Sequence, residues 1–328
     1  MNLQKYQDYF NKISVFFASN SANYWNTITA CNINRKPSKV GQYYLDFITK
    51  RNYIGQISED GIPLYRLGNS APFYHPIVIC QYALGLFEKS FLNNHLDVSI
   101  KKNFLKQADW LVKYFQEENG ISGWYLSFDI KKYGIKSSWI SAMAQGEAIS
   151  VLVRANLLTH DSVYLEVAEK SLKPFYLNVE EGGFVNKFEG FPIYEEYPSP
   201  NKTVAVLNGF IFSLFGLYDL AIHIRNDEAK FLFTQGVKSL KNILKFYDLK
   251  YWSQYYLFDY PNKYPASYTY HILAAEQLKA LYFLTDENIF LIYSEKWKKQ
   301  EKSIINKLRI LFLKIIYART LSWSDSSK

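Results

Sequence analysis

Stretches with the hydrophobic periodicity of α-helices follow one another through most of this 328-residue chain. In one of them, Phe104, Ala108, Leu111 and Val112 recur at the spacing that places side chains on one face of a helix. The stretches come in pairs, so helix hairpins are the expected building unit. We expect helices at residues 73–89, 101–117, 139–158, 161–177, 203–224, 227–247, 267–284 and 287–318.

Short strand-like segments separate the predicted hairpins, at residues 123–128, 182–186 and 252–258. The alternation predicts a mainly α fold class, an (α/α) barrel or toroid of helix hairpins with short β-hairpin loops at the rim of a cleft. Three parts of the chain are expected. They are an N-terminal lead-in that packs on the barrel, the barrel itself and a basic amphipathic C-terminal helix, at residues 1–60, 61–300 and 301–328.

The net charge of +8 is concentrated near the C-terminus. Residues 296–319 hold eight Lys and Arg against a single acid, Glu301, so the rest of the chain is close to neutral. The overall charge therefore predicts neither a nucleic-acid partner nor an acidic substrate. For the amphipathic tail two readings stay open: it contacts an anionic membrane surface, or its apolar face packs on the barrel.

Cysteine and histidine usage excludes several kinds of site. Cys31 and Cys80 are the only cysteines, which excludes a disulfide framework, and no metal-ligand spacing occurs, so we expect neither metal nor cofactor. No apolar run is long enough for a spanning helix, and residues 1–17 do not resemble a signal peptide. These features predict a cytoplasmic enzyme, peripheral at the inner membrane if the tail binds lipid.

Four ordered segments carry a family resemblance. They begin Phe73-Tyr74-His75-Pro76, Trp139-Ile140-Ser141-Ala142, Tyr194-Glu195-Glu196-Tyr197 and Tyr247-Asp248-Leu249, and the third is followed by Val206-Leu207-Asn208-Gly209-Phe210. In sequence and order they resemble the C-terminal domain of D-glucuronyl C5-epimerases. The resemblance implies an (α/α) barrel and an isomerase without a cofactor, which interconverts D-glucuronic and L-iduronic acid units in an acidic polysaccharide such as heparosan.

The resemblance also implies the catalytic residues Glu196, Tyr197, Tyr247 and Tyr270. The C5 hydrogen lies next to a carboxylate, so its removal needs a base, a proton donor on the opposite face and neutralisation of the carboxylate. Glu196 is the expected base and Tyr270 the expected group on the opposite face. Tyr247 is expected to stabilise charge or relay a proton. Tyr268 is an alternative to Tyr270, because residues two apart point in different directions on a helix.

Candidate substrate-binding residues include cations for the carboxylate and polar groups for the hydroxyls. Where the animal enzymes have an arginine after the Y-D-L string, this chain has Lys250, which loses the bidentate fork. The other candidate cations are Arg66, Arg154 and His271. Polar or aromatic candidates within the matched segments are Gln145, Asn208, Tyr74 and Gln81, although helix packing explains their presence equally well.

Three other functions stay open at this level. A polysaccharide lyase would begin with the same C5 abstraction and then expel the C4 substituent. A glycoside hydrolase would need two carboxylates, whereas the motif pairs one carboxylate with tyrosines. A non-catalytic glycan-binding protein could keep the same barrel. The sequence also leaves open whether the chain forms a homodimer.

Overall fold

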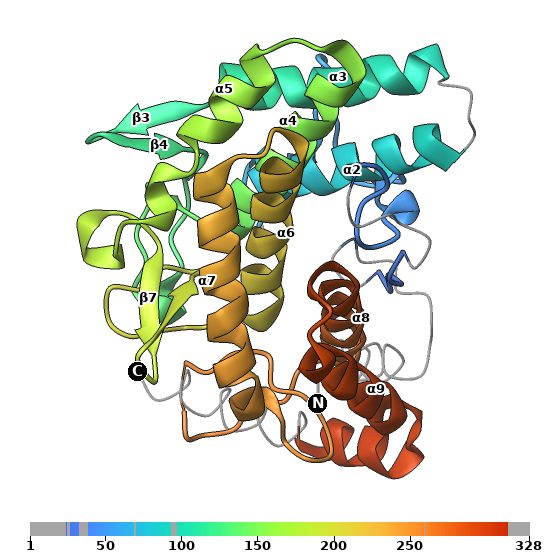
Figure 1. Ribbon diagram of the computed structural model, residues 1–328, viewed down its shortest axis with the longest axis vertical. Helices are drawn as coiled ribbons and strands as arrows, with labels where there is room; N and C mark the ends of the chain where they lie inside the picture. Colours follow the sequence, from blue (N-terminus) through green and yellow to red (C-terminus); the bar gives the residue numbers. More distant parts are fainter. Residues whose placement is uncertain are drawn as a thin grey trace, which may run out of the picture.

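The computed structural model describes residues 24, 27–32, 39–68, 70–92, 97–258 and 260–313. Within them, helices follow in consecutive pairs, shown in Figure 1. The pairs are α2 (Pro76–Leu92) with α3 (Val98–Lys113), α4 (Ala142–Thr159) with α5 (Val163–Lys170), α6 (Leu207–His223) with α7 (Asp227–Ile243), and α8 (Tyr268–Thr285) with α9 (Asn288–Lys302). The mainly helical hairpin architecture predicted from periodicity is confirmed.

The first helix of each pair forms an inner row. Helix α4 packs on both α2 and α6, and α6 packs on α8, while α3, α5, α7 and α9 lie outside. The inner helices α4 and α6 are buried almost all round, whereas α3 and α7 have one buried face. This is the layering of an (α/α) barrel, in which inner helices read as apolar and outer helices as amphipathic.

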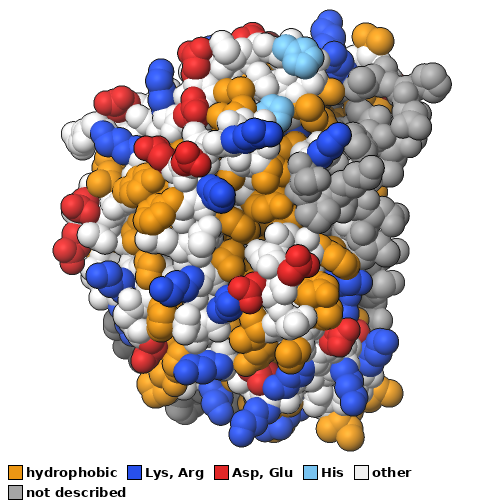
Figure 2. Space-filling view, in the orientation of Figure 1, with side chains coloured by type: hydrophobic (Ala, Val, Ile, Leu, Met, Phe, Trp, Pro, Cys, Tyr) orange, Lys and Arg blue, Asp and Glu red, His pale blue; other side chains and the backbone are white. Residues whose placement is uncertain are grey.

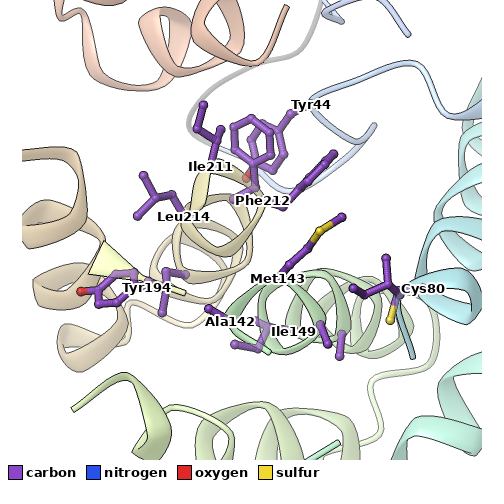
Figure 3. Close-up of a cluster of buried hydrophobic side chains, with 14 of the residues drawn as sticks. Tyr44, Cys80, Ala142, Met143, Ile149, Tyr194, Ile211, Phe212 and Leu214 are labelled. Atoms are coloured by element: carbon purple, nitrogen blue, oxygen red, sulfur yellow. The ribbon is translucent and has the colours of Figure 1, made fainter. Parts of the chain in front are cut away.

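Helices α4 and α6 approach backbone to backbone at two glycines. A Cβ atom at Gly146 would lie 3.0 Å from the Ser213 carbonyl oxygen, and one at Gly216 would lie 2.6 Å from the Gly146 Cα. Larger residues would therefore push the two helices apart. Figure 3 shows Met143 of α4 beside Phe212 of α6 in the apolar cluster formed between them.

Antiparallel two-stranded hairpins lie between the helix pairs. They pair β1 (Leu64–Tyr65) with β2 (Phe73–Tyr74), β3 (Gln116–Glu118) with β4 (Ile121–Gly123), β5 (Tyr125–Leu126) with β6 (Trp139–Ile140), and β7 (Val185–Phe188) with β8 (Phe191–Tyr194). The predicted strand-like segment at 252–258 contributes only isolated bridges, from Ser253 and Gln254. Short 3-10 turns complete the chain, among them η2 (Ile48–Arg51), η3 (Lys131–Tyr133), η4 (Lys173–Phe175), η5 (Val179–Glu181) and η6 (Leu244–Tyr247).

The long C-terminal helix expected at 287–318 is divided in the structure. Helix α9 ends at Lys302, Ser303 is extended, and a further helix runs over residues 304–313. Ile310 on this second helix is buried against Leu249 and Trp252, so part of its apolar surface packs on the barrel. The predicted helical residues 314–318 lie outside the described residues.

The described part of the lead-in packs into the main core. Tyr44 stacks on Phe215 of α6 with ring centroids 4.4 Å apart, and Tyr43 and Phe47 lie beside it. The turn η2 packs against α2, where Gly85 has no room for a side chain beside the Phe47 carbonyl. Residues 39–51 are thereby held at one end of the inner helices.

Candidate active site

A cavity of about 410 Å³ opens among the inner helices, the hairpins and the lead-in. Its polar lining comes from segments far apart in the sequence. These residues are Thr27, Thr29, Lys50, Gln81, Asp129, Glu196, Tyr197, Asn208, Tyr255 and Tyr270. Aromatic rings, among them Phe128, Tyr133 and Trp139, supply apolar walls of the kind that pack against sugar rings.

The Glu196 carboxyl group lies in this cavity just beyond the end of β8. Its side chain is buried, and its Oε2 atom has no hydrogen-bond partner among the described residues. Burial raises the pKa of Glu196 to about 7, and a hydrogen bond from Tyr197 partly opposes that shift. A carboxyl group that titrates near neutrality is suited to accept a proton from a weak carbon acid.

The adjacent Glu195 turns away from the cavity and holds the chain. Its carboxyl oxygens accept hydrogen bonds from the Val204 and Ala205 amides, each at 2.8 Å. Its backbone carbonyl accepts from the Ala142 amide at 3.0 Å, which ties β8 to the start of α4. The two neighbouring acids therefore have different functions: Glu195 fixes the loop, and Glu196 faces the cavity.

Gly209 makes room for the Glu196 side chain at the start of α6. A Cβ atom at this position would lie 2.5 Å from the Glu196 Cβ and 2.9 Å from its Cδ. These separations are far below ordinary contact distance, so only glycine lets the carboxyl group lie against the helix. This contact explains why the Y-E-E-Y-P and V-L-N-G-F strings occur together.

Two phenols share the cavity with Glu196. Burial, followed by the charge of Glu196, raises the pKa of both Tyr197 and Tyr270, so both hydroxyls are protonated at neutral pH. The ring of Tyr255 lies 4.9 Å from that of Tyr270, centroid to centroid. Protonated phenols beside a carboxylate form an arrangement in which one group accepts a proton while another donates one.

The choice between Tyr268 and Tyr270 follows from their positions in the first turn of α8. Tyr270 lines the cavity, whereas the Tyr268 hydroxyl donates a hydrogen bond of 2.5 Å to Glu301 on the outer helix α9. Residues two apart on a helix differ in direction by about 200°, which accounts for the separation.

Tyr247 is buried and does not line the cavity. Its hydroxyl donates a 2.8 Å hydrogen bond to the Ala205 carbonyl, and its pKa is raised by burial and by Glu195. Ala205 has a positive φ of 52° and belongs to the loop that Glu195 also holds. The Tyr247 hydroxyl therefore holds the Ala205 loop, and it does not line the cavity in which a relay group was expected.

A comparison with known sequences identifies the family. The family described as "D-glucuronyl C5-epimerase C-terminus" matches this chain over residues 116–299. The chain belongs to this family. A D-glucuronyl C5-epimerase of Caenorhabditis elegans is 41% identical over 161 residues, which cover 44% of this chain and 26% of the worm protein. The match therefore spans about a quarter of that curated relative.

Other matches extend the comparison. An uncharacterised protein of Methanocaldococcus jannaschii is 31% identical over 201 residues, covering 60% of this chain and 63% of that protein. A solved complex of UGL with dGlcA-Glc-Rha-Glc superposes with a TM-score of 0.50 at 16% identity, covering 68% of this chain and 61% of that one. An identity this low shows a shared fold alone, and the fold is that of the (α/α) barrel.

Two candidate substrate-binding cations belong to the core instead of the cavity. Arg154 is fully buried in an ion pair with Asp219, Nη1 to Oδ2 at 2.6 Å. His271 stacks on Trp252 with centroids 3.6 Å apart, its Nε2 lies 3.0 Å from the Trp297 carbonyl, and burial lowers its pKa to about 3. The contacts of Arg154 and His271 therefore show packing in the core and not a position in the cavity.

Four further candidates also lie away from the cavity lining. Lys250 is exposed with a positive φ of 68°, and Arg66 is exposed beside the lining residue Tyr65. Tyr74 packs against Trp110, with centroids 5.4 Å apart. Gln145 is fully buried against Gly123. Sequence position alone did not separate these side chains from those of the site.

Asn208 and Gln81 do line the cavity, as expected. The Asn208 backbone carbonyl accepts a 3.0 Å hydrogen bond from the Gln277 side chain. Gln81 donates a 3.0 Å hydrogen bond to Glu147 through its amide nitrogen. The Gln81 Oε1 atom is buried and has no hydrogen-bond partner among the described residues.

Sequence reasoning assigned no site role to three further residues: Lys50 and Tyr255 line the cavity, and Glu147 accepts a hydrogen bond from the lining residue Gln81. Lys50 lies in the lead-in, outside every matched string, and nothing in its neighbourhood indicates burial. Glu147 lies directly after Gly146 in the second matched segment, and an acid on a mostly apolar predicted helix was the available signal. Tyr255 belongs to the aromatic segment between Tyr247 and Tyr270, and only its packing on Tyr270 places it at the site.

No metal centre or membrane-spanning helix is found within the described residues. No group of three His, Cys, Asp or Glu side chains there could hold a metal ion. No helix there is long and apolar enough to cross a membrane. Cys31 and Cys80 are both buried and form no disulfide with each other.

Proposed function

We propose that this chain is a polysaccharide C5-epimerase that interconverts D-glucuronic and L-iduronic acid units. The observation that carries the proposal is the buried Glu196 carboxyl group, facing two protonated phenols in one cavity. Membership of the epimerase family supports the same reaction class.

The proposed reaction moves one proton off C5 and returns another. Ionised Glu196 takes the C5 hydrogen as a proton, and the electron pair left on carbon spreads into the sugar carboxylate. The Tyr270 phenol then donates its proton to the opposite face of C5, which inverts the centre and leaves a phenolate. Exchange with solvent restores both groups. Each step conserves charge and needs no redox partner, and Tyr197 is placed to assist through its hydrogen bond to Glu196.

A uronan incubated in heavy water tests this reaction. Heparosan is the probe, and we expect deuterium at C5 without chain cleavage. Glu196→Gln and Tyr270→Phe should each remove most of the exchange. Tyr268→Phe is the matched control, because that hydroxyl lies outside the cavity and binds Glu301. Equal exchange in the Tyr268 and Tyr270 variants would contradict the assignment.

The same incubation separates the competing functions. Growth of the ultraviolet absorbance of an unsaturated uronate would identify a lyase. New reducing ends without that absorbance would identify a hydrolase, for which exposed Asp129, held by the Ser137 amide at 2.9 Å, is the other carboxyl group lining the cavity. Binding of heparosan without exchange or cleavage would indicate a non-catalytic glycan-binding protein.

We also propose that the helix at residues 304–313 contacts an anionic membrane surface. Ile304, Ile305, Leu308 and Phe312 are each more than half exposed on it. Lysine and arginine side chains gather over α9 and this helix at the lower edge of Figure 2. An exposed apolar stripe flanked by cations is suited to the interface of an anionic bilayer.

Vesicle co-sedimentation tests the membrane contact. We expect Ile305→Ser with Leu308→Ser to reduce binding to vesicles that contain an anionic phospholipid. Ile292→Ser on α9 is the matched control, because Ile292 is also 61% exposed but lies outside the stripe. Equal sedimentation of both variants, or equal binding to neutral vesicles, would refute the contact.

A further inference from the structure

Two polar side chains in the wall of the cavity that holds Glu196 contain a buried atom without a partner. Gln81 lies on α2, one turn after the lining residue Ile77, and Thr29 belongs to the lead-in. Each residue is 3% exposed, and neither the Gln81 Oε1 atom nor the Thr29 Oγ1 atom has a hydrogen-bond partner among the described residues. Buried polar atoms are nearly always hydrogen-bonded, so two exceptions in one cavity wall indicate a ligand that supplies the missing partners.

Glu147 fixes the direction of the Gln81 amide. The Gln81 Nε2 atom donates a 3.0 Å hydrogen bond to the Glu147 Oε1 atom, and both side chains are buried. Glu147 lies on the inner helix α4, one turn after the lining residue Met143. Burial raises the pKa of Glu147 well above its usual range, so this acid is neutral at neutral pH. The atom of Gln81 that remains without a partner is an acceptor, which requires a donor such as a hydroxyl group.

The segment that carries Thr29 is fixed by backbone contacts. Residues 30–32 and 44–46 join through amide-to-carbonyl hydrogen bonds of 2.8 and 3.0 Å. The turn η2 follows in the chain and packs against α2, the helix that carries Gln81. Thr29 and Gln81 therefore come from segments that the fold ties together, and a threonine hydroxyl can both donate and accept a hydrogen bond.

A uronate unit inside a polymer offers matching groups. In a unit linked through C1 and C4, the carboxylate is C6 and the ring oxygen joins C1 to C5. The hydroxyl groups at C2 and C3 are therefore the ones left free. C2 lies directly across the ring from C5, so contacts on this side orient the ring and leave C5 accessible. A few fixed polar groups in a largely apolar pocket orient a ligand in this way.

We propose that Gln81 and Thr29 bind the C2 and C3 hydroxyl groups of the uronate unit whose C5 proton Glu196 removes, and that Glu147 is the positioning residue for Gln81. The proposal rests on the proposed function for the identity of the ring and adds the contacts that orient it. Holding the far side of the ring presents one face of C5 to the base, and such positioning lowers the barrier to proton transfer.

Ligands that each lack one hydroxyl group test this inference. The probes are a heparosan tetrasaccharide and two synthetic versions whose glucuronate units lack the C2 or the C3 hydroxyl group, with affinities measured by calorimetry. The unmodified enzyme should bind each deoxy ligand about 5- to 10-fold more weakly than the parent, as expected for the loss of one hydrogen bond. An unmodified enzyme that binds both deoxy ligands as tightly as the parent overturns the proposal, and this measurement requires no variant.

Substitutions of the two lining residues show which contact carries the discrimination. Gln81→Met and Thr29→Val should each bind the parent about 5- to 10-fold more weakly and lose the discrimination against one deoxy ligand. Thr27→Val is the matched control, because Thr27 also lines the cavity but its hydroxyl already donates to the Tyr24 carbonyl at 3.0 Å. This control should keep the discrimination against both deoxy ligands. If Gln81→Met and Thr29→Val fold by their thermal melts and both keep full discrimination, the proposal is overturned.

Two substitutions of Glu147 separate positioning from packing. Glu147→Gln keeps an acceptor for the Gln81 Nε2 atom and should keep the discrimination. Glu147→Leu removes that acceptor and should lose the same discrimination that Gln81→Met loses, while the discrimination that depends on Thr29 stays. A folded Glu147→Leu protein that retains full discrimination overturns the positioning role.

The two proposals fail separately. If heparosan gains no deuterium but the enzyme discriminates against the deoxy ligands, and Gln81→Met and Thr29→Val lose that discrimination, the epimerase reaction is refuted and the hydroxyl-binding site stands. If exchange proceeds and the unmodified enzyme binds the deoxy ligands as tightly as the parent, the epimerase reaction stands and the hydroxyl-binding site is refuted.

Discussion

Substitution of Gly209 by alanine tests the placement of Glu196, the proposed base. Ordinary contact begins at 3.4 Å, whereas the added methyl group would lie 2.5 Å from the Glu196 Cβ and 2.9 Å from its Cδ. The two groups must therefore separate by about 0.9 Å and 0.5 Å respectively. A catalytic group misplaced by about 1 Å can lower the rate about 100-fold, so we expect C5 exchange to fall by roughly that factor.

The stability of this variant should change much less than its activity. Replacement of a glycine by alanine within a helix stabilises the folded protein by up to about 1 kcal/mol. Crowding of a buried side chain destabilises it by about 1–3 kcal/mol. The two effects offset each other, so the free energy of unfolding in urea should shift by less than about 2 kcal/mol. The assay pairs this denaturation curve with the rate of deuterium incorporation at C5 of heparosan.

A matched variant shows whether the loss is specific to the site. Gly236→Ala adds the same methyl group to α7, where it meets the flexible end of the Leu214 side chain away from the cavity. Its exchange rate should stay within about twofold of the original. Full activity in a folded Gly209→Ala protein would refute the placement of Glu196 as base.

Three further predictions follow from buried contacts. Tyr247→Phe leaves the buried Ala205 carbonyl without its donor, so we expect a loss of about 1–3 kcal/mol in unfolding free energy by urea denaturation and a lower kcat at unchanged KM. The pH profile of kcat/KM should rise through about 7 as Glu196 ionises, and a profile that is flat across neutral pH would contradict its role as base. Arg154→Met leaves Asp219 uncompensated, so calorimetry should show about 3–5 kcal/mol of lost stability, and unchanged stability would contradict the pairing.

Much of the fold was predictable from the sequence because helix periodicity is local. A helix in such a fold buries either one face or all of its faces. The spacing of apolar residues within about 15 residues of sequence indicates which of the two applies. Each of the eight predicted helical stretches overlaps an observed helix. The stretch at 161–177 runs too long, because α5 ends at Lys170 and the 3-10 turn η4 follows, and the last stretch is broken at Ser303. The segment at 252–258 formed bridges but no hairpin, because its partners are single residues of neighbouring loops.

The same sequence strings mixed packing residues with site residues. Glu196, Tyr197 and Tyr270 do face one cavity, and Asn208 and Gln81 line it with them. Arg154 and His271 occur in equally specific strings but are held by buried partners in the core. A family motif can contain a residue because it packs in the core or because it contacts substrate. The motif alone therefore cannot distinguish an internal ion pair from a substrate contact.

The sequence by itself determined the hairpin architecture, the family and the carboxyl group that faces the site. Only the tertiary structure decided which side chains from other parts of the chain share a cavity with that carboxyl group. Lys50 and Glu196 are far apart in the chain and reach one cavity because η2 packs on α2 while β8 leads into the start of α6. Such a juxtaposition depends on long-range packing, and no local pattern of residues records it.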